Sequence, residues 1–409
     1  MSHIKSAPRD YGYGEDETLL RDMAHKLLSA RLPMERLREL VAASPEPVYD
    51  RGERAPWDEG LWKEIVDLGW TGLAVGEAEG GSDISLVGIA GVVEEVGRHA
   101  LTSPLLGTLS ASLVLRAAGS EAANAVLARI AAGEPASLAI TNARGSWDPE
   151  AAPLTASKDG DALLLHGTAR FVQDAFKAKT LVVSAALGKE IVLCAVDVAA
   201  TGLTLEADHI HDLTRDQASA HFDAVKVSAD AILSHQGAAV LRRAWPSLLC
   251  LVSADLCGAS EHLLQTTVEY AQQRVQFDRP IGFFQAVKHP LVDAMVQIDR
   301  ARSLLYHACA EIDAGSPDAE TAARMAKSAG SDAAAYMSDR AIQLHGGIGF
   351  TWEYALHIFF KRNLHNQALY GDGVHHRKKL ADLIIGPLGQ SDNASSHADN
   401  PSHTWSTTP

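Results

Sequence analysis

The chain has 409 residues, of which 46% are hydrophobic and 21% charged, a composition typical of globular proteins with two or three domains. Its formal net charge of −15 argues against nucleic-acid binding, because that needs a basic surface. Residues 1–16 lack the apolar core of a secretion signal, no segment is expected to be apolar enough to cross a membrane, and the 4 cysteines have neither disulfide-like nor zinc-like spacing, so we expect a reduced, cytoplasmic protein.

Helical patterns occupy the first part of the chain. Leucines recur at helical spacing over residues 19–28 and again over residues 61–68, where Gly69 is expected to end the helix. Residues 86–97 are rich in Val and Ala and predict another helix. We therefore expect an N-terminal α-helical domain over residues 1–133.

Short apolar runs follow, with Gly, Asp and Pro between them. They lie at residues 137–140, 162–166, 180–185 and 191–196, and their length suits the strands of a compact sheet. These runs predict a middle β domain over residues 134–232.

Helical spacing returns after Asp230. Apolar stripes run over residues 249–270 and 287–312, with Pro290 expected near a helix start or at a kink. We expect a C-terminal helical bundle over residues 233–390, which makes the fold α+β. The polar residues 391–409, rich in Ser, Asn, His and Thr, predict a disordered tail.

Two segments of the C-terminal region share one resemblance. Residues 274–285 have the order Arg-x-x-Phe-x-x-x-Ile-x-x-Phe-Gln, and residues 343–351 begin Gln-x-x-Gly-Gly-x-Gly. Each segment alone also fits an ordinary helix end, with Arg274 in solvent and the glycines stopping a helix. Taken together, they make the chain resemble the acyl-CoA dehydrogenases over about residues 15–388.

This resemblance implies a fold and an activity. The family has an N-terminal helical domain, a β-barrel-like middle domain and a C-terminal four-helix bundle. Its members bind FAD at a subunit interface and remove two hydrogens from Cα and Cβ of an acyl-CoA substrate. The implied electron acceptor is an electron-transferring flavoprotein, and the implied assembly is a homo-oligomer or a hetero-oligomer with a second acyl-CoA dehydrogenase chain.

The resemblance also implies cofactor-binding residues in the C-terminal region. Arg274 and Gln285 reach the FAD of a neighbouring subunit, with Phe277 near the adenine, and a guanidinium matches the oxygens of a pyrophosphate. Asp278 stands where the family usually has glycine. The resemblance also implies that the adenosine half of FAD lies against Gln343, Gly346 and Gly347.

Matches in the middle domain are weaker. Thr141 and Ser146 occupy slots where family members contact the flavin ring, although the usual Glu-Pro pair is absent. Phe171 replaces a tryptophan that covers the flavin, and Gln173 stands where a threonine contacts its N5 side. The alternative is an ordinary strand with Phe171 in the core.

The catalytic base departs from the family pattern. Most members have a glutamate directly after the tyrosine of a Tyr-Glu-Gly turn, but here that position is Gly371. Other members supply it from a long helix, at the place of Leu248. Asp372 is the adjacent carboxylate and the candidate base; the alternative is a helix cap before His375. We expect no metal site, and His375 and His376 are interpreted as surface or interface residues.

Three hypotheses follow. The chain is a self-sufficient flavoenzyme, or one subunit of a hetero-oligomeric acyl-CoA dehydrogenase whose partner supplies the base, or a flavin-binding or structural paralogue with other chemistry. The loss of the base beside intact FAD segments favours the second. The sequence Gly-Phe-Thr-Trp-Glu at residues 349–353 resembles relatives in bacterial breakdown of lipids and bulky sterol-like compounds.

Overall fold

Helices form the N-terminal part of the computed structural model, which describes residues 13–42 and 57–386. Side chains cap several of them: Asp58, Ser85 and Ser120 each accept a hydrogen bond from a backbone N–H in the first turn of the helix that follows. The helices are α1 (Glu15–Arg31), α2 (Met34–Val41), α3 (Glu59–Asp67), α4 (Leu86–Arg98), α5 (Leu105–Ala118) and α6 (Glu121–Ala131), with short 3₁₀ turns η1 (Trp70–Gly72) and η2 (Glu77–Glu79).

A mixed sheet follows, in the order β6-β7-β3-β2-β4-β5-β8, with β1 pairing in parallel with β4. The middle strand β4 is almost fully buried, which explains its unbroken apolar run. The strands are β1 (Ala136–Ala139), β2 (Leu154–Asp159), β3 (Ala162–Gln173), β4 (Thr180–Leu187), β5 (Glu190–Asp197), β6 (Leu203–Ala207), β7 (Gln217–Val227) and β8 (Ile232–Ser234), with η3 (Ala229–Ala231) before the last.

Long helices make up the C-terminal part. Pro290 lies in the second turn of its helix, as the sequence suggested. The elements are α7 (Gly237–Gln273), the hairpin β9 (Val275–Gln276) and β10 (Arg279–Pro280), η4 (Ile281–Phe283), α8 (Gln285–Asp313), α9 (Ala319–His345), η5 (Gly346–Phe350), α10 (Leu356–Ala368) and α11 (Gly373–Ile384).

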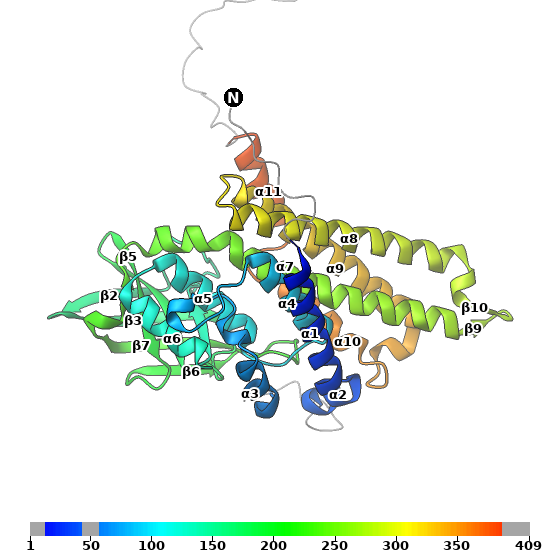
Figure 1. Ribbon diagram of the computed structural model, residues 1–409, viewed down its shortest axis with the longest axis horizontal. Helices are drawn as coiled ribbons and strands as arrows, with labels where there is room; N and C mark the ends of the chain where they lie inside the picture. The colour runs from blue at the N-terminus through cyan, green and yellow to red at the C-terminus, as the bar shows by residue number, and fades with distance from the viewer. Residues whose placement is uncertain (1–12, 43–56, 387–409) are drawn as a thin grey trace, which may run out of the picture.

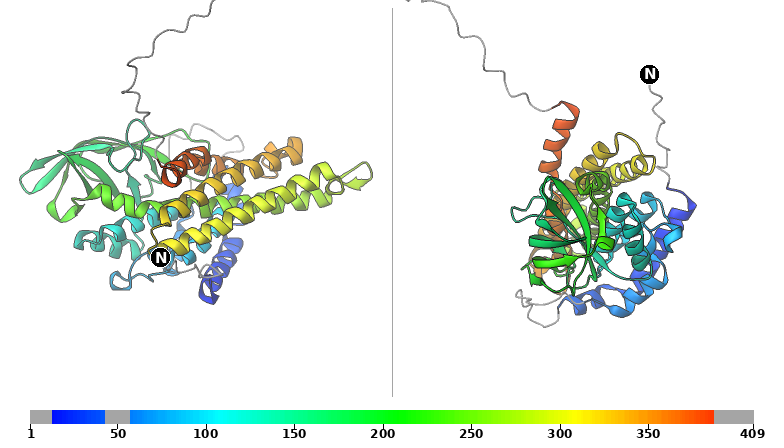
Figure 2. Two further views of the ribbon diagram at one scale, coloured as in Figure 1. Left: turned by 90° about the horizontal axis from the view of Figure 1, so that it is seen from above. Right: turned by 90° about the vertical axis from the view of Figure 1, so that its left-hand side faces the viewer.

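The three groups of elements lie along one long axis (Figure 1). The sheet occupies one end, the β9–β10 hairpin the other, and the N-terminal helices pack beside α7 between them; Figure 2 shows the sheet curling over its own face. One hydrophobic core joins the N-terminal helices to α7–α10, and a second lies inside the sheet. The α+β prediction is therefore confirmed.

Helix α7 approaches α4 closely through two glycines. A Cβ added to Gly97 on α4 would lie 2.2 Å from the Asp255 carbonyl oxygen, and one added to Gly258 on α7 would lie 1.8 Å from that of Glu94. Only glycine permits this approach. It buries the middle of α7, including the Asp255 side chain, against the N-terminal helices.

Two expectations need adjustment. The strand path β6 to β8 has two ends, so the sheet is barrel-like without being a closed barrel in the part of the chain that the structure describes. The expectation that no segment is apolar enough to cross a membrane is wrong for α7, which is long and apolar enough. However, 89% of its apolar window is buried inside the protein, as in a core helix.

The element limits support division of the chain at 133/134 and 232/233, because helices end at Ala131, strands run from Ala136 to Ser234, and α7 begins at Gly237. The division itself stays a prediction. The predicted tail at 391–409 lies outside the described residues.

Candidate active site

A narrow cavity, here called the inner cavity, lies where the sheet meets α5 and α7. Its volume of about 20 Å³ is enough for roughly one water molecule. It is lined by Leu106, Gly107 and Ser110 of α5, by Ser137, Leu138, Ile140 and Thr141 at the end of β1, by Phe171 and Gln173 of β3, and by Arg215, Val252, Leu369 and Tyr370. The structure thus brings together Thr141 and Phe171, which are 30 positions apart in the sequence.

Irregular pairing of β3 creates this lining. The register between β3 and β7 shifts between Ala169 and Val172. Within this bulge Phe171 has φ +58°, a left-handed conformation that costs a non-glycine residue energy. Phe171 is 46% exposed. The alternative interpretation, which placed it in the core of an ordinary strand, is therefore wrong.

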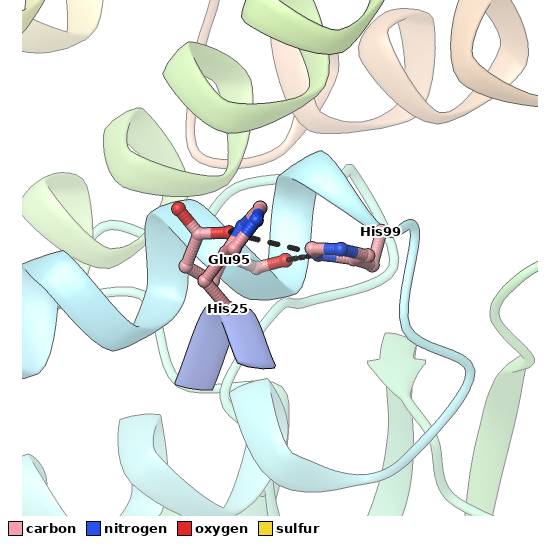
Figure 3. Close-up of side chains that lie close together, drawn as sticks. All are labelled: His25, Glu95 and His99. Carbon is pink, nitrogen blue, oxygen red and sulfur yellow. Dashed lines mark hydrogen bonds and ion pairs between the residues drawn. The ribbon is translucent and has the colours of Figure 1, made fainter. Parts of the chain in front are cut away.

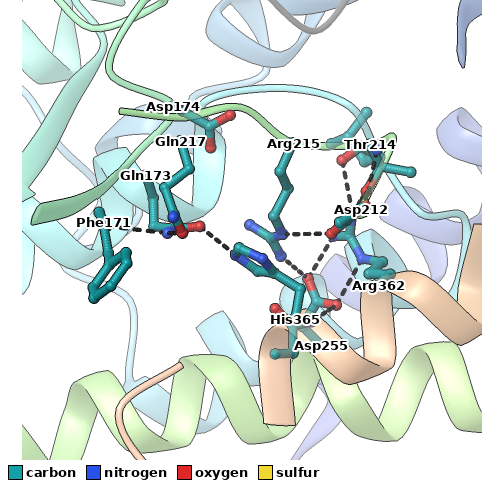
Figure 4. Close-up of polar contacts among 12 residues, drawn as sticks. Phe171, Gln173, Asp174, Asp212, Thr214, Arg215, Gln217, Asp255, Arg362 and His365 are labelled. Atoms are coloured by element: carbon teal, nitrogen blue, oxygen red, sulfur yellow. Dashed lines mark hydrogen bonds and ion pairs between the residues drawn. The ribbon is translucent and has the colours of Figure 1, made fainter. Parts of the chain in front are cut away.

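Gln173 is held by three hydrogen bonds (Figure 4). Its Nε2 donates to the Phe171 carbonyl at 3.1 Å and to Gln217 Oε1 at 2.7 Å, and its Oε1 accepts from His365 Nε2 at 2.6 Å. Burial lowers the pKa of His365 to about 4, so its ring is neutral at pH 7 and carries its proton on Nε2. Both N–H groups of the Gln173 amide are therefore committed to the protein.

A buried ionic network adjoins the inner cavity through Arg215, which lines that cavity (Figure 4). Asp255 accepts from Arg362 Nε at 2.8 Å, from Arg362 Nη2 at 2.5 Å, from Arg215 Nη2 at 2.8 Å and from Asn366 Nδ2 at 2.7 Å. Burial acts to raise the pKa of Asp255, but the two guanidiniums outweigh it and hold that pKa below its ordinary value. Asp255 therefore anchors Arg215 at the cavity wall and is a structural carboxylate.

The turn that replaces the family's glutamate has a specific geometry. Gly371 has φ +99°, and a Cβ added to it would lie 2.6 Å from Cδ2 of His375. The buried Lys327 holds this turn by donating from Nζ to the Gly371 carbonyl at 2.7 Å, to the Gln367 carbonyl at 3.1 Å and to Ser331 Oγ at 3.1 Å. Burial lowers the pKa of Lys327 to about 7. A side chain at position 371 would therefore require the His375 ring to move and would sit on a backbone conformation that favours glycine.

Two other positions were considered for the catalytic base, Asp372 and Leu248. Asp372 is exposed and caps α11, because its Oδ1 accepts from the His375 backbone N–H at 2.7 Å. It lines neither the inner cavity nor the outer cavity described next. Leu248 is fully buried in α7. Among the described residues, no carboxylate lines the inner cavity.

A second space, the outer cavity, lies on the other side of Tyr370 and has a volume of about 520 Å³. The Tyr370 ring, which lines the inner cavity, has its centroid 5.1 Å from that of Trp245 and 6.4 Å from that of Trp147, and both tryptophans line the outer cavity. Ser146 also lies here. The cationic side chains of this cavity are Arg144, Arg242, Arg324 and Lys379.

The remaining cofactor candidates lie at the opposite end of the molecule, around the β9–β10 hairpin (Figure 1). Phe277 is 85% exposed at the hairpin turn and shares with Gln343 a groove of about 440 Å³, here called the hairpin groove. Arg274 at the end of α7 and Gln285 at the start of α8 are exposed at the same end.

This surface fits one half of a flavin dinucleotide. Nothing lies within 4 Å of a Cβ placed on Gly346 or Gly347, so their backbone is open to an approaching ligand. Arg274 supplies a charge for phosphate oxygens. Thr141, which follows β1, and Phe171, in β3, belong to the sheet, which lies at the end of the molecule opposite the β9–β10 hairpin (Figure 1).

Sequence reasoning missed three of these residues: Arg215, His365 and Arg362 in its role as partner of Asp255. A signal was present, since Asp255 interrupts the apolar stripe of α7, and a buried carboxylate requires a cationic partner.

Known proteins are similar to this chain in sequence and in fold. Family models for the acyl-CoA dehydrogenase N-terminal and C-terminal domains match residues 14–134 and 249–384. The acyl-CoA dehydrogenase IpdE2 of Mycobacterium tuberculosis is 32% identical over 85% of this chain and 91% of its own length.

Two solved structures have similar folds. The Tcur3481-Tcur3483 steroid acyl-CoA dehydrogenase, solved as a variant, has a TM-score of 0.81 and 30% identity over 91% of this chain and 98% of that one. A chain from a study of the electron transferring flavoprotein of Acidaminococcus fermentans has a TM-score of 0.82 and 25% identity over the same shares. The chain therefore belongs to the acyl-CoA dehydrogenase family of oxidoreductases acting on CH–CH bonds, and FAD is its cofactor.

Proposed function

We propose that this chain is the subunit of a hetero-oligomeric acyl-CoA dehydrogenase that completes the FAD site of a partner chain, while the partner provides the catalytic base. The observation that carries the proposal is the absence of a carboxylate from the described lining of the inner cavity, together with a turn at Gly371 whose φ of +99° and nearby His375 ring disfavour any side chain. Desaturation of a thioester requires a base at Cα, whereas FAD accepts the hydride from Cβ. The exposed hairpin end supplies Arg274, Phe277, Gln285, Gln343, Gly346 and Gly347 to the partner's cofactor.

The experiment is expression of this chain alone and together with a second, unlike acyl-CoA dehydrogenase chain that has the glutamate. The proposal expects the chain alone to carry little flavin and to show no turnover, and the pair to be yellow and active. Substitution of the partner's glutamate by glutamine abolishes turnover in the pair. A yellow, active homo-oligomer of this chain alone would contradict the proposal.

The role of Arg274 gives a direct prediction. Arg274→Ala in the assembled enzyme removes a charge-assisted hydrogen bond worth about 1.5–3 kcal/mol and weakens FAD binding by roughly 10- to 100-fold. Flavin content after gel filtration, and a titration of the flavin-depleted enzyme with FAD, measure this. The matched control is Arg279→Ala in the same hairpin, whose guanidinium instead lies 4.3 Å from the Phe283 ring centroid. Equal losses in both variants would contradict the assignment.

Asp372 is expected to act as a helix cap. Asp372→Asn keeps both turnover and stability near the wild type, because asparagine caps equally well, while Asp372→Ala lowers the free energy of unfolding by about 1 kcal/mol. Turnover of the assembled enzyme and urea denaturation check the two halves. If Asp372→Asn lost turnover by about 100-fold or more at unchanged stability, Asp372 would be the base after all.

A second candidate function is supported by the outer cavity. In this alternative, the chain binds an acyl-CoA itself, with Arg144 and Lys379 attracting the CoA phosphates and Tyr370 moving aside for the acyl group. The favoured proposal expects the double variant Arg144→Gln, Lys379→Gln to leave KM of the assembled enzyme within about twofold of wild type, while use of this cavity raises KM about tenfold.

Substrate and acceptor complete the proposal. The solved steroid acyl-CoA dehydrogenase supports a bulky, sterol-like acyl group and a place in bacterial lipid or sterol catabolism. The Acidaminococcus neighbour supports an electron-transferring flavoprotein as acceptor. The cysteines, which are buried and free, agree with a cytoplasmic location. A panel of straight, branched and ring-bearing CoA thioesters, assayed with an artificial acceptor, tests the substrate class.

A further inference from the structure

Two imidazoles and a carboxylate meet where α1 packs on α4, away from the cofactor residues (Figure 3). His25 lies on α1 and Glu95 on α4, and His99 is the C-cap residue that directly follows α4. One ligand atom of each lies within 4.8 Å of the others. None of the three lines the inner cavity, the outer cavity or the hairpin groove.

Hydrogen bonds set the orientation of both rings. His25 Nδ1 lies 2.8 Å from Glu95 Oε2, and His99 Nδ1 lies 3.0 Å from the Glu95 backbone carbonyl. A carboxylate and a carbonyl only accept, so each ring carries its proton on Nδ1 and has its lone pair on Nε2. Metal-ligating histidines are usually held in this way, with the other ring N–H donated to a carboxylate or a carbonyl.

Both Nε2 atoms face one hydroxyl. Ser29 Oγ lies 3.0 Å from His99 Nε2 and 3.4 Å from His25 Nε2. A hydroxyl has one proton and can donate it to only one of the two rings at a time. At any moment, therefore, one of the two Nε2 lone pairs accepts no hydrogen bond from Ser29. Both lone pairs face the small space around the Ser29 hydroxyl.

The charges around the rings favour ligand-competent imidazoles. Burial lowers the pKa of His99, which keeps its ring neutral at pH 7 although Glu95 opposes this effect. Arg98 Nε lies 3.3 Å from Glu95 Oε1 as an ion pair, without donating a hydrogen bond to it. Glu95 thus orients His25 through Oε2, while the nearby guanidinium of Arg98 offsets its negative charge.

We propose that His25 and His99, oriented by Glu95, form a binding site for a divalent transition-metal ion such as Zn²⁺, which imidazole ligands suit. The two Nε2 atoms are the protein ligands, and Ser29 or water completes the coordination. The ion would connect α1 to α4. Since α1 fully buries only Ala24 and Leu28, this link adds to a thin packing surface.

The test uses the full chain, stripped of metal with EDTA and then given Zn²⁺ or Co²⁺. We expect saturating Zn²⁺ to raise Tm by about 3 °C or more and Co²⁺ to give d–d absorption, each with one site per chain. His25→Ala, at a side chain that is 54% exposed and so harmless to the fold, should weaken Zn²⁺ binding at least tenfold, and Glu95→Gln about tenfold.

The matched control is His221→Ala, which removes a histidine that also lies 3.0 Å from a glutamate, Glu206, but belongs to no such cluster among the residues that the structure describes. It should keep the full response to Zn²⁺. A wild-type Tm that does not respond to Zn²⁺ would overturn the proposal. So would an equal response in His25→Ala, because the ion would then bind elsewhere on the chain.

Discussion

Replacing Asp255 with asparagine is expected to lower the free energy of unfolding by about 3–5 kcal/mol, because the change leaves two buried guanidiniums without their shared carboxylate. Arg362 is fully buried and Arg215 is 5% exposed, so water cannot replace the lost partner. Urea or thermal denaturation monitored by circular dichroism measures the effect.

The control is Glu206→Gln, which removes an exposed carboxylate paired with His221 and should cost less than about 1 kcal/mol. The pH dependence supplies a second check. Since the folded pKa of Asp255 is depressed, its contribution is complete above the unfolded pKa near 4 and is lost as pH falls through the folded value. The wild type should lose stability below about pH 4, and Asp255→Asn should lack this part of the loss. A small destabilisation in Asp255→Asn would show that the arginines find other partners.

Gly371→Glu is expected to destabilise the chain by about 3 kcal/mol and to create no turnover. This substitution places a glutamate at the position where most family members have one. Two physical terms contribute. The backbone there has φ +99°, and the new Cβ would meet the His375 ring at 2.6 Å. Denaturation and turnover of the chain with a CoA thioester measure both halves of the expectation.

Two further variants separate these terms. Gly188→Glu changes a glycine with φ +63° that has open space around it, so it reports backbone strain alone, about 1 kcal/mol. The double variant Gly371→Glu, His375→Ala removes the nearest clash and should recover about 1–2 kcal/mol. If Gly371→Glu were no worse than Gly188→Glu, the turn would be able to rearrange around a base, and the argument from lack of space would fail.

The helical parts of the fold could be predicted because their patterns are long and local. The 37 residues of α7 carry a stripe that spans many turns, and Gly69 ends α3 with φ +76°, as expected. Strands β2, β6, β7 and β8 were not foreseen, since they are short or partly exposed and their pairing depends on distant partners. The same limit hid the bulge that exposes Phe171.

The site shows the same division. The motif at residues 274–285 and the glycine pair at 346 and 347 could be recognised, because each is a continuous stretch of sequence. The pairs His365 with Gln173 and Arg215 with Asp255 are 192 and 40 positions apart. No local sequence pattern marks His365, Gln173 or Arg215 as a member of such a pair. Only the isolated carboxylate of Asp255, within an apolar stripe, indicated that such a contact must exist.

The separation of the predicted cofactor residues onto opposite ends of the molecule has a thermodynamic consequence for the proposed assembly. When one FAD molecule needs two chains, flavin binding and subunit association are linked by mass action, so each strengthens the other. Dilution should release flavin, and added flavin should hold the assembly together at lower protein concentration. Under the proposed assembly of two unlike chains, a cell that makes one chain in excess would accumulate colourless, inactive protein, and the scarcer chain would set the yield of enzyme.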